Sequence, residues 1–236
     1  MRSILVISAA DRAAFEAALA SEADALAFDL AGDADVEVAR KNAVAWIVEA
    51  RGLSRRCLAQ IHPLASGLAD GDLEAVVAAR PDGIIQPDAC GARDVQHLGA
   101  KLAVREAEND LPDGSVKILA LAADSPAAIF ELGSIARAAR RLIGLGRDEY
   151  LLMRRLGIAE KGAGESPEPL RVARALCLFA AAAAGAPAYD SAETGESEDF
   201  TRNCATAARE NFAGKFVVTA AQAKIANAVF AKKDRS

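Results

Sequence analysis

Short apolar runs recur eight times along the chain, and each run ends at a polar residue and is followed by a stretch with helical periodicity. The runs are Ile4–Ile7, Ala25–Phe28, Cys57–Ile61, Gly83–Ile85, Ile118–Leu121, Leu142–Leu145, Ala188–Tyr189 and Phe216–Val218. Strands that alternate with helices form parallel sheets, because each strand needs a crossover to return to the same edge. Eight such units predict an α/β protein with a single closed (β/α)₈ barrel, the TIM-barrel fold.

Polar residues at the ends of these runs are the first candidates for function. In a (β/α)₈ barrel the catalytic groups lie on the loops that follow the strands. The residues at these places are Ser8, Asp29, His62, Asp88, Asp124, Glu149, Asp190 and Thr219.

Helices are expected between the runs. Asp11 precedes the first helical stretch and is a predicted N-cap, because its carboxylate can accept from free backbone N–H groups. The second helix is expected at residues 36–50, with an inner face made by Val36, Val44, Ile47 and Val48. The remaining expected helices are Gly71–Ala79, Ala92–Glu108, Pro126–Ala139, Asp148–Leu156, Pro169–Ala184 and Asp199–Asn211.

Two polar stretches late in the chain, Gly157–Pro169 and Ser191–Glu198, are predicted to be flexible loops. Each follows a late strand, so each is expected on the face where a barrel keeps its active site. They either fold over the barrel mouth or are solvent loops without a role.

Length and composition fit one barrel. The chain has 236 residues, close to the roughly 250 of a typical (β/α)₈ domain, so residues 1–236 are expected to form one domain. Hydrophobic residues make up 52% of the chain but aromatic residues only 5%, which predicts a core of small side chains.

Charge and targeting signals narrow the class of protein. A net charge of −5 argues against a nucleic-acid surface, and the basic group Arg137, Arg140 and Arg141 is expected at a helix end, where cations meet the carbonyl dipole. No secretory h-region follows Met1, and Ala175–Ala186 is shorter than the ~20 residues of a membrane span. A cytoplasmic protein without a membrane partner is expected. The four cysteines form no C-x-x-C pair and are expected to be reduced.

Several phrases, in order over nearly the full length, resemble the HpcH/HpaI aldolase and citrate lyase beta-subunit superfamily. The opening M-R-S-I-L-V-I-S and the later A-D-A-L-A-F-D-L are similar to its R-S-x-L-F-V-P-G and A-D-x-x-x-x-D-L-E-D. The other matching phrases are P-D-G-I-I-Q-P, D-S-P-A-A-I-F-E-L-G-S-I-A, A-P-A-Y-D and E-N-F-A-G-K-F-V-V-T-A-A-Q. Their joint order is more specific than any one phrase.

This resemblance implies a Mg²⁺-dependent barrel that makes or breaks a carbon–carbon bond beside a carbonyl or an acyl-CoA thioester. It also implies a homo-oligomer, a trimer or a hexamer. The family's metal lies on a glutamate after strand five, which falls on Asp124, and an aspartate after strand six. That aspartate falls on Glu149, or on Asp148 if the local alignment shifts by one.

Several polar positions of the family are changed in this chain. The strand-three arginine, which holds the substrate's carboxylate and carbonyl in the family, falls on Gln60, and its companion asparagine on His62. The strand-four lysine falls on Asp88. The phrase D-L-E-D ends as Asp29-Leu30-Ala31-Gly32, and the closing His-Pro becomes Thr219-Ala220.

Asp124 and Glu149 keep two carboxylates at the strand ends where the family binds its metal. Weak Mg²⁺ binding is therefore expected there, since enolate chemistry needs a cation beside the developing negative oxygen. The alternative is that both acids only stabilise helix N-termini.

Substrate binding must differ from the family, because Gln60 carries no charge and cannot form a bidentate pair with a carboxylate. A substrate carboxylate would meet Arg147 or Arg174 instead, although Arg174 is also interpreted as a solvated helix residue. Asp88 is the third candidate at the substrate site, where its negative charge would repel an anionic substrate. His62 is either a general base or a hydrogen-bonded structural residue. Asp29 and Asp190 either support the site or are turn residues.

Two functions remain open. The first is a divergent carbon–carbon lyase that acts on a small carboxylic acid or its acyl-CoA ester, with Gln60, His62 and Asp29 as the catalytic candidates. The second is a catalytically silent barrel kept as a binding or assembly subunit. A lyase with a different reaction run by His62 is a third reading.

Overall fold

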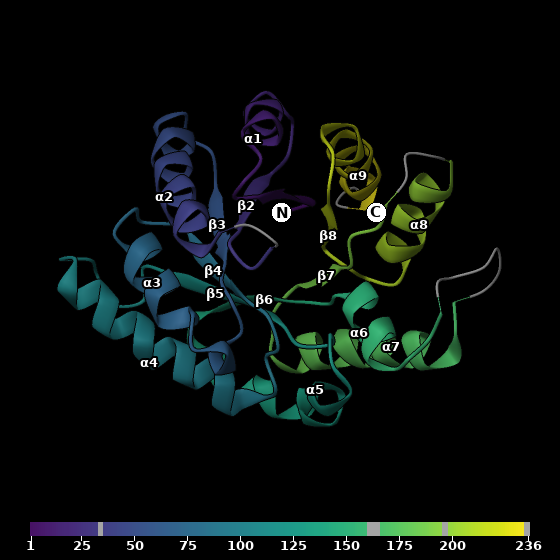
Figure 1. Cartoon of the computed structure of the whole chain (residues 1–236). Coiled ribbons are helices and arrows are strands. Elements are labelled where there is room, and N and C mark those ends of the chain that lie inside the picture. The colour runs from purple at the N-terminus through teal and green to yellow at the C-terminus, as the bar shows by residue number, and fades with distance from the viewer. Residues whose placement is uncertain (33–34, 160–165, 195–197, 234–236) are drawn as a thin grey trace.

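Eight parallel strands close into a barrel in the computed structural model, which describes residues 1–32, 35–159, 166–194 and 198–233. Each strand pairs with the next along the chain, and β8 pairs with β1, which confirms the predicted TIM barrel (Figure 1). The strands are β1 (Ser3–Ser8), β2 (Ala25–Asp29), β3 (Cys57–Gln60), β4 (Gly83–Gln86), β5 (Lys117–Leu121), β6 (Leu142–Gly146), β7 (Ala188–Asp190) and β8 (Gly214–Val217).

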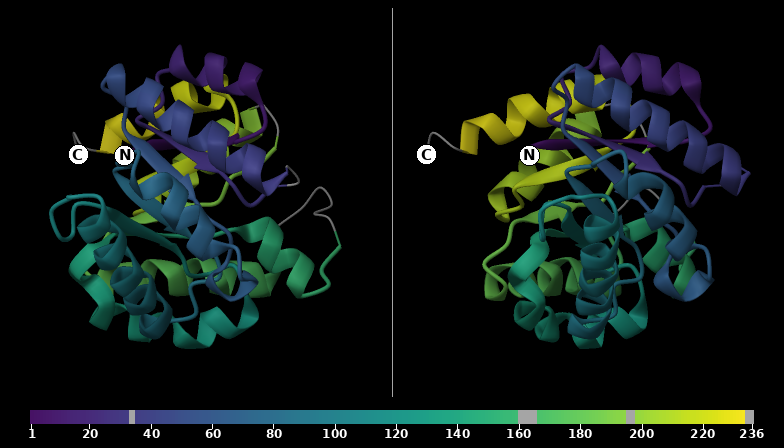
Figure 2. Two further views of the ribbon diagram at one scale, coloured as in Figure 1. Left: turned by 60° about the vertical axis from the view of Figure 1, so that its left-hand side comes forward. Right: turned by 90° about the vertical axis from the view of Figure 1, so that its left-hand side faces the viewer.

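Helices surround these strands on the outside of the barrel (Figures 1 and 2). They are α1 (Arg12–Leu19), α2 (Val36–Gly52), α3 (Ala69–Val77), α4 (Ala92–Glu108), α5 (Pro126–Glu131), α6 (Glu149–Arg155), α7 (Glu168–Ala183), α8 (Glu198–Arg209) and α9 (Ala220–Lys233). Two 3₁₀ segments complete the described elements, η1 (Leu64–Ser66) and η2 (Leu132–Arg141).

Polar side chains begin several of these helices, as the sequence indicates. The predicted cap at Asp11 is confirmed, because its Oδ1 accepts from the backbone N–H of Ala14 at 2.9 Å. Asp148 caps α6 in the same way, and Ser125 caps α5 just before a proline at the first helical turn. Such caps satisfy N–H groups that have no partner within the helix.

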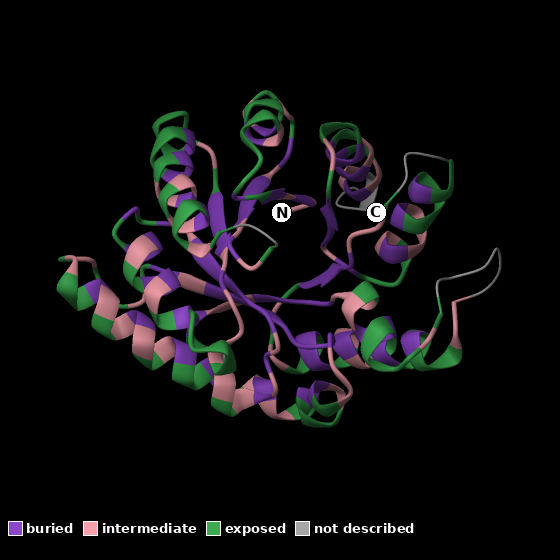
Figure 3. Ribbon diagram, in the orientation of Figure 1, coloured by how far each residue is buried: buried purple, intermediate pink, exposed green. Residues whose placement is uncertain are grey.

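Apolar side chains fill two layers, one inside the barrel and one between the strands and the helices. The strands are buried and the outward faces of the helices are exposed (Figure 3). The inner layer includes Ile4, Leu58 and Phe216, and the outer layer holds many alanines. In the outer layer the ring of Phe15 stacks against that of Trp46, with ring centroids 4.8 Å apart.

Two expectations about the helices need correction. Val48 is 58% exposed, and the buried face of α2 is made by Ala39, Ala43, Trp46, Ile47 and Ala50. The helix expected at Pro126–Ala139 ends at Glu131 and continues as η2, which is kinked at Ala138. α9 was not predicted. Arg141 lies at a helix end, as expected, and is buried there against Glu106.

Other predictions are tested only in part. Of the two expected flexible loops, residues 160–165 and 195–197 lie outside the described residues. All four cysteines are free thiols, and only Cys90 is half-exposed. Within the described part of the chain, no helix is long and apolar enough to cross a membrane.

Candidate active site

The carboxyl ends of the strands open into a cavity of about 780 Å³. Its polar wall includes Asp29, Gln60, Arg147, Asp148, Glu149 and Ser191. β2, β3, β6 and β7 position these groups, since each residue ends a strand or lies within three residues of its end. The cavity therefore occupies the place where (β/α)₈ enzymes keep their catalytic groups.

Asp29 and Gln60 form a pair across neighbouring strands, where the β2–β3 register sets them side by side. The Gln60 side-chain amide donates to Asp29 Oδ1 at 3.0 Å, and the backbone N–H of Ala31 donates to the same oxygen at 2.9 Å. Burial raises the pKa of the Asp29 carboxyl even though both hydrogen bonds favour its charged form. Gln60 is thus oriented by Asp29 rather than free to turn.

His62 is held by Asp72, a residue of α3 that the sequence did not single out. Asp72 Oδ2 lies 2.7 Å from His62 Nδ1 and also accepts from the His62 backbone N–H at 2.8 Å. Its other oxygen accepts from Arg40 at 2.9 Å, and the carboxylate is fully buried. An acid that accepts from Nδ1 fixes the ring and leaves Nε2 as the acceptor of the imidazole.

Asp124 is a fully buried carboxylate with one oxygen unpaired. Oδ2 accepts from the backbone N–H of Asp88 at 2.8 Å, whereas Oδ1 has no hydrogen-bond partner among the described residues. Burial, together with the negative charges of Asp88 and Asp148, raises the pKa of Asp124 to about 7. A buried carboxylate oxygen without a donor is costly, so this atom is a candidate ligand for a cation.

Arg155 of α6 reaches across the mouth of the barrel to this acid. Its Nη2 donates to Asp88 Oδ2 at 2.9 Å, and its Nη1 lies 4.0 Å from Asp124 Oδ1. The charge of Asp88 is therefore matched by Arg155. Sequence reasoning could not find this pairing, because the two residues are 67 positions apart.

Glu149 and Asp148 have different partners. The Glu149 carboxylate forms an ion pair with Arg147, and its backbone N–H donates to Ser191 Oγ at 2.9 Å. Asp148 accepts from the backbone N–H of Leu151 at 2.9 Å through one oxygen, as the cap of α6. Asp148 also acts electrostatically on both Asp29 and Asp124.

A buried ion cluster centred on Asp190 lies behind the cavity. Asp190 accepts from Arg147 Nε at 2.9 Å, from Arg174 Nη1 at 2.7 Å and from Lys215 Nζ at 3.3 Å. Burial opposes ionisation, yet these three cations hold the pKa of Asp190 well below its usual range. Asp190 thus anchors two arginines and a lysine.

Arg174, a candidate for binding the substrate carboxylate, instead contacts other residues of the protein. Besides Asp190, it donates to Glu210 at 2.6 Å, and its guanidinium lies 4.6 Å from the centre of the Phe212 ring. It is not among the described residues that line the cavity.

Comparison with known proteins shows what the chain is similar to. No family model matches the chain. The citrate lyase subunit beta of Haemophilus influenzae is 28% identical over 242 residues, which cover 98% of this chain and 79% of that protein. Over nearly its full length the chain is therefore similar to a citrate lyase beta subunit. The expected resemblance is confirmed.

Solved structures share the fold of this chain. The citrate lyase beta subunit of Mycobacterium tuberculosis, complexed with oxaloacetate and magnesium, is 20% identical, with a TM-score of 0.80 and coverage of 97% of this chain and 96% of that one. A complex of protein CitE from the same organism with magnesium, acetoacetate and coenzyme A is also 20% identical. Its TM-score is 0.78, and the match covers 97% of this chain and 80% of that one.

The acids at the superfamily's metal positions suit a small hard cation. Among the described residues no group of three or more histidines, cysteines or acids is placed to hold a metal. Mg²⁺ does not need one, because it keeps several waters and is bound through one or two carboxylates. The unpaired Oδ1 of Asp124 and the nearby charge of Asp148 meet that requirement.

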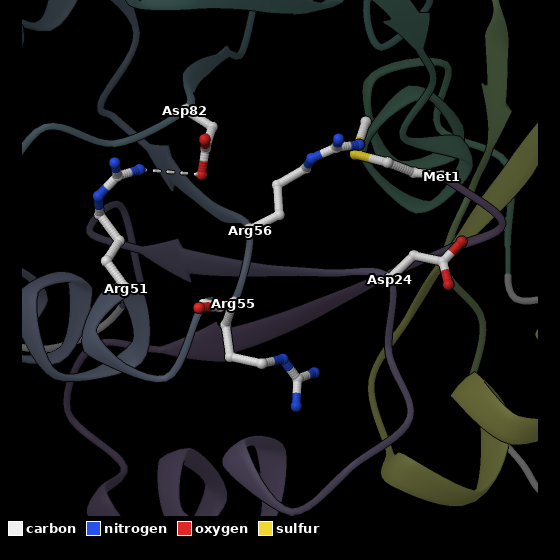
Figure 4. A pocket seen from close by; sticks show the side chains of 7 residues that line it. Met1, Asp24, Arg51, Arg55, Arg56 and Asp82 are labelled. Carbon is white, nitrogen blue, oxygen red and sulfur yellow. Dashed lines mark ion pairs between the residues drawn. The ribbon is translucent and has the colours of Figure 1, made fainter.

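A second cavity, of about 700 Å³, lies at the opposite end of the barrel and is lined by residues that precede the first four strands (Figure 4). Its charges are largely paired, since Arg51 lies 3.3 Å from Asp82 and Arg55 donates to backbone carbonyls of residues 19, 21 and 23. In (β/α)₈ barrels this end bears on stability rather than on catalysis.

Proposed function

We propose that the protein is a Mg²⁺-dependent carbon–carbon lyase that acts on a small carboxylic acid or its acyl-CoA ester. The observation that carries the proposal is the buried carboxylate of Asp124, three residues after β5, whose Oδ1 has no hydrogen-bond partner among the described residues. The M. tuberculosis relatives, crystallised with magnesium and with oxaloacetate or with acetoacetate and coenzyme A, support the choice of substrate class.

Asp124 and Asp148 are the proposed metal ligands. The sequence favoured Glu149 as the second ligand, but its carboxylate pairs with Arg147, while Asp148 lines the cavity and acts electrostatically on Asp124. When bound, the ion supplies positive charge beside the oxygen of an enolate, which lowers the barrier to cleavage next to a carbonyl.

The protein's own polar groups would orient the substrate and move a proton. Gln60, fixed by Asp29, offers a neutral amide to a substrate carbonyl. His62, fixed by Asp72, is the proposed proton carrier, because the pKa of a histidine in water lies near neutrality.

Metal titration tests this proposal. Calorimetry with Mg²⁺ or Mn²⁺ should show weak binding that Asp124→Asn and Asp148→Asn lose. Glu149→Gln, one residue further along, is the matched control and should retain it. Cleavage of short 3-hydroxy acids and their CoA thioesters, followed by the carbonyl product, should require the metal. If the folded protein shows no heat of binding at millimolar metal concentration, the proposal is contradicted.

A specific observation favours the silent barrel as the second candidate. Arg155 Nη1 lies 4.0 Å from the unpaired Asp124 oxygen, so a cation of the chain itself already faces the place proposed for the metal. If the wild type binds no metal and Arg155→Ala gains binding, the arginine has replaced the ion.

Assembly and location remain predictions of the family resemblance. A homo-oligomer, trimer or hexamer, would appear in light scattering coupled to size exclusion. A cytoplasmic location would appear in cell fractionation.

A further inference from the structure

Arg147 is a buried cation at the active-site cavity with one donor nitrogen unused. It directly follows β6, its side chain is 2% exposed, and it lines the cavity. Nε donates to Asp190 at 2.9 Å and Nη2 pairs with Glu149, whereas Nη1 has no hydrogen-bond partner among the described residues. A buried guanidinium N–H left unpaired is costly, which indicates that a ligand supplies its partner.

The buried ion cluster holds Arg147 in place. The side chains of Arg147 and Asp190 are each 2% exposed, and that of Lys215 is 4% exposed. Glu149, which pairs with Arg147, is 14% exposed. The guanidinium is therefore positioned before a ligand binds, and Nη1 is the donor that remains for an acceptor.

We propose that Arg147 Nη1 receives a carboxylate of the substrate. The inference rests on the proposed function in that it takes this cavity to be the active site. The substrate class is then a short acid that keeps a free carboxylate near the carbonyl or hydroxyl carbon at which the bond breaks.

The other polar groups serve this role less well. The Gln60 amide is neutral and already donates to Asp29. Arg174 is engaged by Asp190 and Glu210 and does not line the described cavity wall. Arg147 alone among these three residues combines a positive charge, a place on the cavity wall and an unpaired donor. Its pairing with Asp190 fixes the guanidinium, so little entropy is lost when a carboxylate binds.

Malonate and its neutral analogue malonamide are the probes. Calorimetry in buffer with EDTA and in buffer with Mg²⁺ should show that the wild type prefers malonate. Arg147→Gln should weaken malonate binding about tenfold to a hundredfold, which corresponds to one charge-assisted hydrogen bond, and should remove the preference over malonamide. Arg147→Lys should be intermediate, because it keeps the charge but loses the planar fork.

Lys215→Gln is the matched control. It also removes a cation from Asp190, but Lys215 does not line the described cavity wall, so malonate binding should stay within about twofold. Circular dichroism verifies that each variant folds. If Arg147→Gln does not fold, Arg147→Lys tests the inference instead, and it should bind malonate more weakly than the wild type.

Two results would overturn the inference: equal affinity of wild type and Arg147→Gln for malonate, or a wild type that does not distinguish malonate from malonamide. The measurement in EDTA needs neither metal nor turnover. A protein that binds no Mg²⁺ would therefore contradict the lyase proposal, but the malonate measurement would still test the role of Arg147.

Discussion

Asp124 carries a carboxylate whose charged form is disfavoured by burial, with a pKa of about 7 against an ordinary value of 3.8. A raised pKa means that the folded state holds the proton more tightly than the unfolded state. The stabilisation from protonated Asp124 is therefore fully present below pH 3.8 and is lost as the pH rises through about 7.

Asp124→Asn should then become progressively more stable than the wild type as the pH rises from 5 to 8. The full shift corresponds to at most about 4 kcal/mol of unfolding free energy. Urea unfolding in metal-free buffer at both pH values measures the difference. Asp70→Asn, which removes an exposed carboxylate of α3, should show no such gain. If the curves of wild type and Asp124→Asn stay parallel from pH 5 to 8, Asp124 is charged throughout.

For single residues, the sequence predicted which acids follow a strand, but not which side chains form hydrogen bonds or ion pairs with the groups of the site. Asp29, Asp124 and Glu149 follow from the ends of apolar runs, because side chains there must open on the same face of a barrel. Asp72 and Arg155 could not be found in this way. They act through contacts between different βα units, and no periodic pattern marks such contacts.

Glu106 and Arg141 join α4 to the end of η2 by a buried ion pair. Two parallel bonds of 2.8 Å connect them, and the side chains are 1% and 6% exposed. Burial opposes ionisation, but the hydrogen bonds from Arg141 and from the backbone of Val116 and Gly114 bring the pKa of Glu106 down to about 2. Its stabilisation is thus present above about pH 4.5 and is lost as the pH falls through about 2.

Glu106→Gln is expected to lower the unfolding free energy by about 3 kcal/mol at pH 7, because Arg141 is left buried without its counter-charge. Chemical denaturation at pH 7 and pH 3 measures this, and the difference between variant and wild type should shrink at pH 3. Arg140→Gln, which removes an 80% exposed guanidinium of the same segment, should change stability by less than about 1 kcal/mol. Equal losses from both variants would disprove the special role of the buried pair.

Helices with a clear periodic pattern of apolar residues were predicted best. Elements whose bounds depend on packing against neighbouring helices were predicted less well. α4 was expected at Ala92–Glu108 and has those bounds. The helix after β5 instead becomes η2, where close contacts with α4 and α7 override helical propensity. α9 mixes alanine, lysine and asparagine around its surface, so no apolar stripe marked it. Its buried face is set by packing against α8, β1 and β8.

Closure of the barrel is the feature of the whole molecule that no local pattern encodes. Eight strand–helix units imply it, but the joint itself lies between β8 and β1 at the two ends of the chain. α9 stabilises this joint, since Oδ1 of its Asn227 accepts a hydrogen bond from Ser3 Oγ of β1 at 2.8 Å. The register at the joint depends on a glycine at the start of β8.

Gly214→Ala should destabilise the whole barrel. A Cβ at this position would lie against the backbone carbonyl oxygens of Met1 and Arg2, 2.6 Å from the latter, and strand backbone cannot rotate aside as a side chain can. Forcing extra atoms into such a contact typically costs about 1–3 kcal/mol, and we expect a loss of this size in chemical denaturation. Gly52→Ala is the control, because no atom lies within 4 Å of a Cβ there at the end of α2. That exchange should be neutral or stabilising by up to about 1 kcal/mol. An unchanged midpoint for Gly214→Ala would mean that β1 and β8 can separate without loosening the fold.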